Sequence, residues 1–269
     1  MPLNSLLAIR GQVPRGISIV LGIIPILAIL LLWFLFTAGA PEERRIAPTI
    51  LPSPTEVVQS IPELVTSRDL RHHVWASIRR VGLSFMLALI IVLPLGVLMG
   101  SFGSVGAIFT PIATASGYIP IATLVPLTMS WFGIDELQKI MFLAMAFGIY
   151  LLPLVVNAIA AVPDIYLRTS YTLGASRLNA IRYVLVPIAL PDIWHAMRLA
   201  FGVGWTYIVL AEVVVMVDGL GFLIQNSFRR GPREHIYLVI LVITLIAWVA
   251  DLGWVKLGKI LFPYRQDRS

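Results

Sequence analysis

The residues of this chain that could perform catalysis are few, and their spacing matches no catalytic or metal site. The sequence contains no cysteine, which excludes disulfides, thiolate metal sites and cysteine nucleophiles. The four histidines, at positions 72, 73, 195 and 235, include no pair four residues apart, so the helical zinc motif His-Glu-x-x-His is absent. Asp192 and His195 are close in sequence but belong to no Ser-His-Asp set. We therefore expect no catalytic site, no metal and no other cofactor in this chain.

One motif partly matches a phosphate-binding loop. It is formed by Gly253, Gly258 and Lys259, and it lacks the magnesium ligand that such a loop requires. Ile260 stands where a serine or threonine must bind magnesium, and the motif lies in an apolar helical pattern with no strand before it. We interpret the match as a coincidence, so the chain is not expected to hydrolyse ATP itself.

The composition explains why catalytic residues are scarce. Of 269 residues, 58% are hydrophobic and only 13% are charged, and the mean hydropathy is +0.90. A soluble domain has about 25% charged residues, so the charged side chains of this chain are too few to cover the surface of a soluble protein of this size. The sequence therefore excludes a soluble enzyme and a disordered chain, and it predicts an all-α, polytopic membrane protein.

The hydropathy pattern predicts six membrane-spanning helices. A helix needs about 20 apolar residues to cross the hydrocarbon core, and this length leaves room for about six spans with their loops. The first block has an Ala-Gly-Ala sequence after it, which is also found at signal-peptide cleavage sites, but its apolar length favours a span. The expected spans are residues 17–37, 81–100, 105–132, 140–162, 197–217 and 236–261.

These spans divide the chain into regions whose charges predict the orientation. Basic residues are enriched in cytoplasmic loops, and the net charge is +6. The pattern favours both termini in the cytoplasm and an external segment with a short interfacial helix over residues 53–65, which begins with a capping box at Ser53 and Glu56 and which Pro62 interrupts. The expected regions are a tail with the first span (1–40), the external segment (41–76), a five-helix core (77–262) and a cytoplasmic tail (263–269).

Three ionisable residues fall within or beside predicted spans, where a charge needs a partner or a function. Glu212 is expected either to gate the outer mouth or to pair with Arg79 or Arg80. Asp251 is expected to contact an arginine or the backbone of a neighbouring helix. Arg198 is expected either to reach the cytoplasmic headgroups or to attract an anion that leaves inward.

The third apolar block differs from the other spans because prolines interrupt it at positions 111, 120 and 126. Proline removes a backbone donor, and loosened backbone is tolerated in lipid only against protein or a water-lined cavity. The block also carries hydroxyl groups, as expected for a pathway. The candidate path residues, in this block and in the fifth span, are Ser116, Tyr118, Pro120, Thr123, Thr128, Ser130, Trp205, Thr206 and Glu212.

The second span contains Gly96 and Gly100, a Gly-x-x-x-Gly spacing that favours close approach of another helix.

The longest polar insert, residues 163–192, predicts a helical hairpin on the cytoplasmic side. Pro163 and Asp164 favour a helix start, Gly174 favours its end, and Ser176 favours the cap of a second helix.

The second helix of this hairpin is predicted to be amphipathic. Leu178, Ile181 and Leu185 lie on one face, and Pro187 and Pro191 are expected to end the helix. The apolar face must be covered by the lipid interface, by the protein's own spans or by a partner.

The same hairpin carries a resemblance to a known family. Its sequence at residues 172–177 and 184–191 resembles the cytoplasmic EAA loop of ABC importer permeases, with Arg168, Thr169 and Ser170 in place of Glu-Ala-Ala. Further stretches are similar to permeases of the nitrate, sulfonate, taurine and bicarbonate type, so that the resemblance covers about residues 50–262. These stretches are residues 51–54, 119–127, 131–134, 211–212 and 219–222.

The resemblance implies a type I ABC importer permease core in which the hairpin is a coupling helix that docks on a separate ATPase. The residues that it assigns to docking are Asp164, Arg168, Thr169, Ser170, Leu173, Gly174, Ala175, Ser176 and Pro187.

The resemblance also implies the setting of the protein. It implies a multi-pass permease of the bacterial inner membrane, in contact with lipid and not with nucleic acid, working as a homodimer. The expected partners are cytoplasmic ATP-binding subunits, which would bind ATP and Mg²⁺, and an external or periplasmic solute-binding protein. The implied solute is a small anion such as nitrate, a sulfonate, taurine or bicarbonate. The alternative is a carrier driven by an ion gradient, or a channel, that acts without an ATPase.

Overall fold

The computed structural model describes residues 13–264 except positions 41, 43, 215 and 216, and all regular secondary structure in this part of the chain is helical. The predicted tail residues 1–12 and 265–269 lie outside the described residues. The elements in chain order are α1 (Arg15–Phe36), α2 (Pro54–Gln59), α3 (Ile61–Thr66), α4 (Leu70–Ser101), α5 (Gly103–Ser116), the short 3-10 helix η2 (Ile121–Thr123), α6 (Leu124–Phe132), α7 (Glu136–Ala160), α8 (Asp164–Thr172), α9 (Arg177–Ala180), the π-turn η3 (Ile181–Leu185), α10 (Val186–Val214), α11 (Leu220–Arg230) and α12 (Glu234–Leu261).

The long helices confirm the predicted class of polytopic membrane protein. Five helical segments are long and apolar enough to cross a membrane, namely α1, α4, α7, α12 and the segment that joins α9 to α10. The third predicted span, residues 105–132, is present as α5 followed by η2 and α6, and the two parts meet at an angle of 89°.

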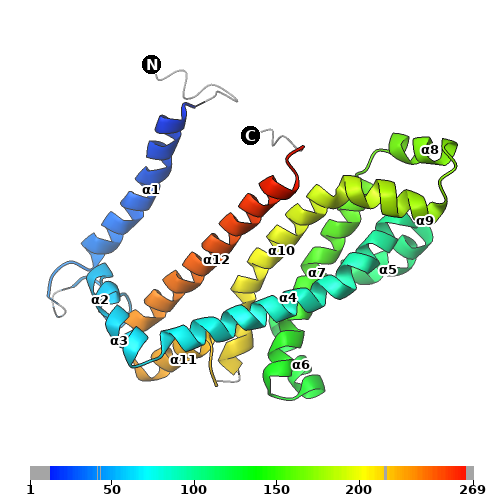
Figure 1. Ribbon diagram of the computed structural model, residues 1–269. Coiled ribbons are helices and arrows are strands. Elements are labelled where there is room, and N and C mark those ends of the chain that lie inside the picture. Colours follow the sequence, from blue (N-terminus) through cyan, green and yellow to red (C-terminus); the bar gives the residue numbers. More distant parts are fainter. Residues whose placement is uncertain (1–12, 41, 43, 215–216, 265–269) are drawn as a thin grey trace.

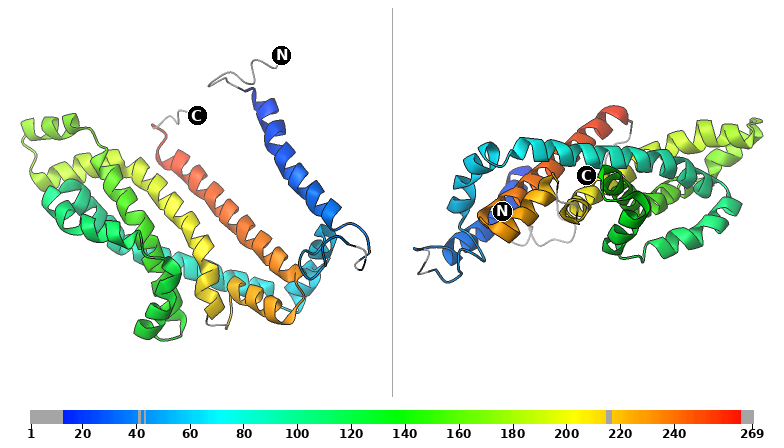
Figure 2. Two further views of the ribbon diagram at one scale, coloured as in Figure 1. Left: turned by 180° about the vertical axis from the view of Figure 1, so that it is seen from behind. Right: turned by 90° about the horizontal axis from the view of Figure 1, so that it is seen from below.

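The two ends of the helical bundle differ in what they carry (Figure 1). The start of α1, the end of α12 and the pair α8–α9 lie at one end, which we call the hairpin end. Helices α2, α3, α6 and α11 lie at the opposite end, as the left view in Figure 2 also shows. Helix α1 stands apart and is anchored near its C-terminus, where Trp33 Nε1 donates to the Pro52 carbonyl over 2.9 Å.

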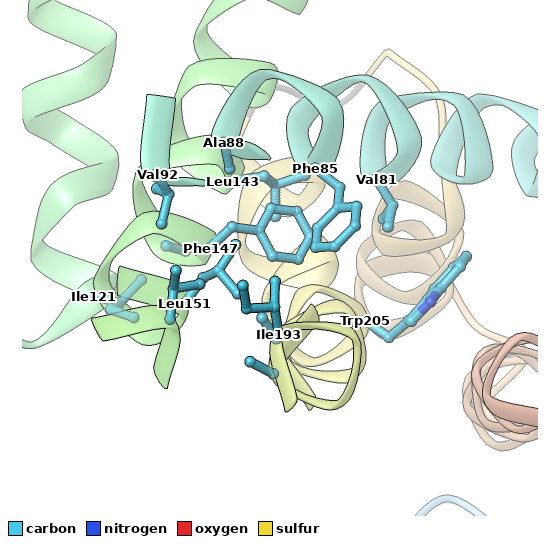
Figure 3. Close-up of a cluster of buried hydrophobic side chains, with 14 of the residues drawn as sticks. Val81, Phe85, Ala88, Val92, Ile121, Leu143, Phe147, Leu151, Ile193 and Trp205 are labelled. Atoms are coloured by element: carbon cyan, nitrogen blue, oxygen red, sulfur yellow. The ribbon is translucent and has the colours of Figure 1, made fainter. Parts of the chain in front are cut away.

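The core lies where α4, α7 and α10 meet (Figure 3). The rings of Phe85 on α4 and Phe147 on α7 pack edge to face with their centroids 5.1 Å apart. Leu143, Leu151 and Ile193 fill the space around these rings and are almost completely buried. These contacts join three helices into one body.

Close packing of α4 on α7 confirms the interpretation of the Gly-x-x-x-Gly spacing. A Cβ atom built on Gly96 would lie 2.7 Å from the side chain of Val155, and one built on Gly100 would lie 2.7 Å from that of Ile159. Such distances are too short for carbon atoms, so only glycine allows the two helices to lie this close.

Two predicted boundaries are wrong. The second span begins at Leu70 and not near residue 81, because its first turns are polar and hydropathy does not detect them. The fifth span begins at Arg177, since the helix runs without interruption to Val214 and contains both Pro187 and Pro191. The π-turn directly before α10 alters the hydrogen-bond ladder next to Pro187, a local adjustment that lets proline stay within a membrane helix.

The segment predicted to be external, residues 41–76, contains two short helices where one interrupted helix was predicted. The capping box at the start of α2 is confirmed: Ser53 Oγ accepts from the Glu56 amide over 3.2 Å, and Glu56 Oε2 accepts from the Ser53 amide over 2.8 Å. The break lies at Ser60, and Pro62 is in the first turn of α3. Arg44 also donates to Glu56, which lowers the pKa of that carboxyl to about 2.

We predict that Gly96→Ala and Gly100→Ala each destabilise the protein by about 1–3 kcal/mol, since the new methyl group must force α4 and α7 apart. The measurement is the unfolding temperature of the purified protein in detergent. Gly82→Ala is the matched control on the same helix, because a Cβ there meets no atom within 4 Å. Equal unfolding temperatures for all three variants would contradict the close approach.

We also predict that the external segment loses stability in acid. The pKa of Glu56 is about 2 in the folded chain and 4.5 as its model-compound value, so the carboxylate contributes stability above pH 4.5 and loses it as the pH falls towards 2. Glu56→Gln removes the titrating group, so its unfolding temperature should be lower than that of the native protein at pH 7, and the difference should shrink between pH 4.5 and 2. A difference independent of pH would show that ionisation of Glu56 is irrelevant.

Candidate functional site

The hairpin end presents α8, a tight turn and α9, as the sequence predicts. Asp164 lies in the first turn of α8, and the chain reverses at Gly174, whose φ of +80° is unfavourable for residues with a side chain. The amide of Ala175 donates to the Ser170 carbonyl over 3.0 Å and closes the turn. Ser176 Oγ then accepts from the Asn179 amide over 3.3 Å and caps α9. The turn is therefore defined by local hydrogen bonds.

Most of the predicted docking residues lie on the surface of this hairpin. Leu173 at the turn is 82% exposed, and Leu178 on α9 is 72% exposed. Ser170 is buried and donates to the Leu167 carbonyl over 2.8 Å, and Ala175 is half-buried. The remaining predicted docking residues are exposed: Asp164, Arg168, Thr169, Gly174, Ser176 and Pro187. Exposed apolar side chains on a hairpin that also carries polar residues are typical of a surface that contacts another protein.

The apolar face predicted for the second hairpin helix is divided between the core and the surface. Leu185 is buried in the main core, and Ile181 packs against that core. Leu178 remains exposed. Below the hairpin, a pocket of about 250 Å³ separates it from the turn between α4 and α5 and is lined by Phe102, Tyr171 and others.

The break in the third span lies at residues 117–120, between α5 and η2. Pro111 and Pro126 lie within helices and do not break them. At the break, Tyr118 is 83% exposed. Ser116 and Thr123 satisfy their hydroxyl groups locally, on the carbonyls of Ala113 and Pro120 at 2.8 and 2.7 Å.

The other predicted path residues fall into an exposed group and a buried group. Pro120, Thr123, Ser130 and Thr206 are exposed, as Tyr118 is, and Ser116 is half-buried. The buried group comprises Thr128, Trp205 and Glu212.

Thr128 and Trp205 have different polar surroundings. Thr128 Oγ1 accepts from Gln138 Nε2 over 2.9 Å and so ties α6 to α7. Trp205 is 4% exposed, and its Nε1 has no hydrogen-bond partner among the described residues.

Glu212 belongs to a buried cluster of charges at the opposite end of the bundle, centred on Arg80 of α4. Arg80 Nη1 lies 2.8 Å from Glu212 Oε1, and Arg80 Nη2 lies 2.6 Å from Glu136 Oε1 and also contacts Asp218. Lys139 Nζ is 3.0 Å from Glu136 Oε1. The exposed fraction is 2% for Arg80 and 0% for Glu212. We call these five residues the Arg80 cluster.

The Arg80 cluster shows which arginine pairs with Glu212, and it contains two further carboxylates. Of the two arginines proposed as partners of Glu212, the structure selects Arg80, whereas Arg79 is exposed. Glu136 and Asp218 were not predicted as partners, because both lie at or beside loops, where water can solvate a carboxylate without a cation beside it.

Helix α11 was also missed, and its first turn is held by Glu212 of the Arg80 cluster together with two side chains of α4. The three amides of residues 219–221 donate to His73 Nδ1 (2.9 Å), Ser77 Oγ (2.9 Å) and Glu212 Oε2 (2.8 Å), in that order. Side chains of α4 and α10 therefore satisfy the free donors that begin this helix. The available sequence signals were the glycines on both sides, Gly219 and Gly231, and two arginines in its last turn.

The two remaining intramembrane charges pair with each other. Arg198 on α10 donates from Nε and Nη2 to both carboxylate oxygens of Asp251 on α12, at 2.6 and 2.8 Å. The predicted arginine contact of Asp251 is confirmed. Arg198 is therefore held against α12 by two hydrogen bonds.

Among the described residues, no group of three His, Asp or Glu side chains is placed to hold a metal ion.

Comparison with known proteins identifies this arrangement. Residues 92–254, more than half of the chain, match the family described as "Binding-protein-dependent transport system inner membrane component". The chain is 30% identical over 266 residues to the taurine transport system permease protein TauC of Escherichia coli (strain K12), which covers 96% of this chain and 94% of the relative. It is 27% identical over 224 residues to the putative aliphatic sulfonates transport permease protein SsuC of Bacillus subtilis (strain 168), with coverage of 82% and 80%.

A solved structure supports the fold. A chain of the MetNI methionine ABC transporter in an inward-facing conformation superimposes with a TM-score of 0.65 and 20% sequence identity, over 71% of this chain and 95% of that chain. The family description and the apolar helices place the protein in the inner membrane as a multi-pass protein. The chain therefore belongs to the family of binding-protein-dependent transport system inner membrane components, as an ABC importer permease of the nitrate, sulfonate and taurine type.

Proposed function

We propose that this chain forms the translocation path of an ATP-driven importer for a small sulfonate-type or related anion, and that the hairpin end faces the cytoplasm. The observation that carries the proposal is the exposed apolar tip of the hairpin, with Leu173 at 82% and Leu178 at 72% exposure. In this arrangement the tip docks on a separate ATP-binding subunit, which supplies ATP and Mg²⁺. An external solute-binding protein delivers the anion at the opposite end.

The covalent path from the hairpin to the opposite end supports a coupling role. The helix that begins at Arg177 continues to Val214 over 38 residues, a length of about 57 Å at 1.5 Å per residue. One end of this helix is in the hairpin, and the other carries Glu212 of the Arg80 cluster. A displacement imposed at the hairpin is thereby transmitted as movement of a rigid element to the opposite end.

The path itself is assigned to the exposed residues of the broken span. Tyr118, Pro120, Thr123 and Ser130 present ring and hydroxyl groups on the surface of a single copy. A second copy of the chain facing this surface would enclose a polar path without placing a loosened backbone against lipid. The proposed assembly is therefore a homodimer with two ATP-binding subunits. The anion class rests on the names of the relatives, which transport taurine and aliphatic sulfonates.

We predict that Leu173→Ser abolishes assembly with the ATP-binding subunit, because removing a central apolar contact costs about 2 kcal/mol or more, roughly 30-fold in affinity. The measurement is the amount of ATPase that co-purifies, followed by ATP-dependent uptake of taurine and of an alkyl sulfonate into proteoliposomes of the assembled complex.

The matched control is Tyr118→Ser, because Tyr118 is as exposed as Leu173, at 83% against 82%, but lies in the broken span. It should retain the ATPase while changing uptake. Normal association of Leu173→Ser would contradict docking at the tip, and uptake that follows an ion gradient without ATP would support a carrier instead.

The Arg80 cluster generates a separate prediction about stability and about α11. Arg80→Leu should lower the free energy of unfolding by about 3–5 kcal/mol, since it leaves the buried Glu212 without its cation. Hydrogen exchange should increase in residues 219–223 before it increases in α7. Arg79→Leu is the control, because Arg79 precedes Arg80 and is exposed. A protein with unchanged exchange at α11 would show that the cluster does not hold this helix.

A further inference from the structure

A pocket of about 310 Å³ opens between α10 and α12 at the hairpin end, away from both the broken span and the hairpin tip. Its walls come from residues 191–198 of α10 and residues 254–262 of α12. One part of the wall is aromatic and another is charged. None of the roles discussed above uses this pocket.

The aromatic wall is built on two adjacent tryptophans whose rings are tilted by 57° to each other. The rings of Trp194 and Trp254 lie with their centroids 4.5 Å apart, and Trp194 Nε1 donates to the Trp254 carbonyl over 3.1 Å. Gly258 makes room for them, because a Cβ there would lie 2.9 Å from Trp194 Nε1. Phe262 extends the wall, with its centroid 6.2 Å from that of Trp194. Three neighbouring aromatic rings therefore line this side of the pocket.

The charged wall presents two cations on opposite helices. Arg198 is oriented by its bidentate contact with Asp251, which occupies N–H groups on two of its nitrogens and leaves other guanidinium donors for a further acceptor. Lys259 lines the pocket from α12, where its side chain is exposed. Asp192 adds a carboxylate to the α10 wall, and His195 adds an imidazole.

The surroundings of the pocket are apolar and exposed. Residues next to the lining positions include Leu199, Leu257 and Leu261, with exposed fractions of 48%, 51% and 52%. Such a surface suits acyl chains, and tryptophan beside basic residues is typical of the headgroup level of a membrane.

We propose that this pocket binds the headgroup of a zwitterionic aminophospholipid from the leaflet at the hairpin end. The phosphate contacts Lys259 and Arg198, and the ammonium lies over the tryptophan ring faces on the side of Asp192. The cations satisfy the phosphate through charge-assisted hydrogen bonds, and ring faces attract an ammonium electrostatically. A pocket with both kinds of wall matches a headgroup with both charges better than it matches a purely anionic one.

The test is native mass spectrometry of the purified full chain, titrated with phosphatidylethanolamine, phosphatidylglycerol or inorganic phosphate. The native protein should retain one phosphatidylethanolamine more tightly than any phosphatidylglycerol, and Lys259→Gln should weaken that retention about tenfold because it removes a charge-assisted hydrogen bond. Lys256→Gln is the matched control, because Lys256 is an exposed lysine of the same helix that does not line the pocket.

A second variant tests the aromatic wall. Trp194→Leu should weaken the retention of phosphatidylethanolamine and leave the retention of phosphatidylglycerol unchanged. This comparison holds if the unfolding temperature of the variant matches that of the native protein. If the variant does not fold, the result for Lys259→Gln decides. Equal retention by Lys259→Gln and Lys256→Gln would overturn the proposal. Preference for phosphatidylglycerol, or saturation by inorganic phosphate with no effect of lipid, would also overturn it.

Discussion

A charge that leaves water for the interior of a helical bundle needs an opposite charge beside it, and this requirement determines how the end opposite the hairpin is assembled. Arg80 contacts carboxylates from α7, from α10 and from the loop before α11. The carboxylate of Glu212 in turn accepts from the first turn of α11. One buried guanidinium therefore connects four elements, namely α4, α7, α10 and the loop before α11.

Local chemistry made most of the fold predictable. Apolar length identified the spans, and Gly174 and Ser176 identified the hairpin turn, because each signal acts over a few neighbouring residues. The ends of α4 and α10 were not predictable in this way. Proline at position 187 normally ends a helix, but here the adjacent π-turn and the surrounding helices keep the chain helical. Helix α11 depends on acceptors more than 130 residues away in sequence for two of its first amides, which no local pattern contains.

The same distinction applies to the candidate site. An intramembrane carboxylate such as Glu212 must have a partner, so its pairing with an arginine at the outer end of α4 could be predicted from hydropathy. Glu136 and Asp218 lie where water can solvate them, and sequence alone therefore does not require them to converge on the same arginine. The function of the exposed path residues is harder to predict from the sequence. Tyr118 and Thr123 lie on the surface of one copy, so their function depends on what faces them, and a single sequence does not encode that directly.

The continuous helix from Arg177 to Val214 relates the two ends of the molecule. Had the prolines ended the hairpin helix as predicted, a flexible joint would separate the hairpin from the fifth span, and force applied at Leu173 would be absorbed there. Instead, the helix passes from the turn at Ser176 through the core to Glu212, and only the π-turn interrupts its regular hydrogen bonding. The Arg198–Asp251 pair ties α10 to α12 between these ends. In the proposed coupling, a movement of the hairpin is therefore passed to α12 through this ion pair and to the Arg80 cluster through Glu212.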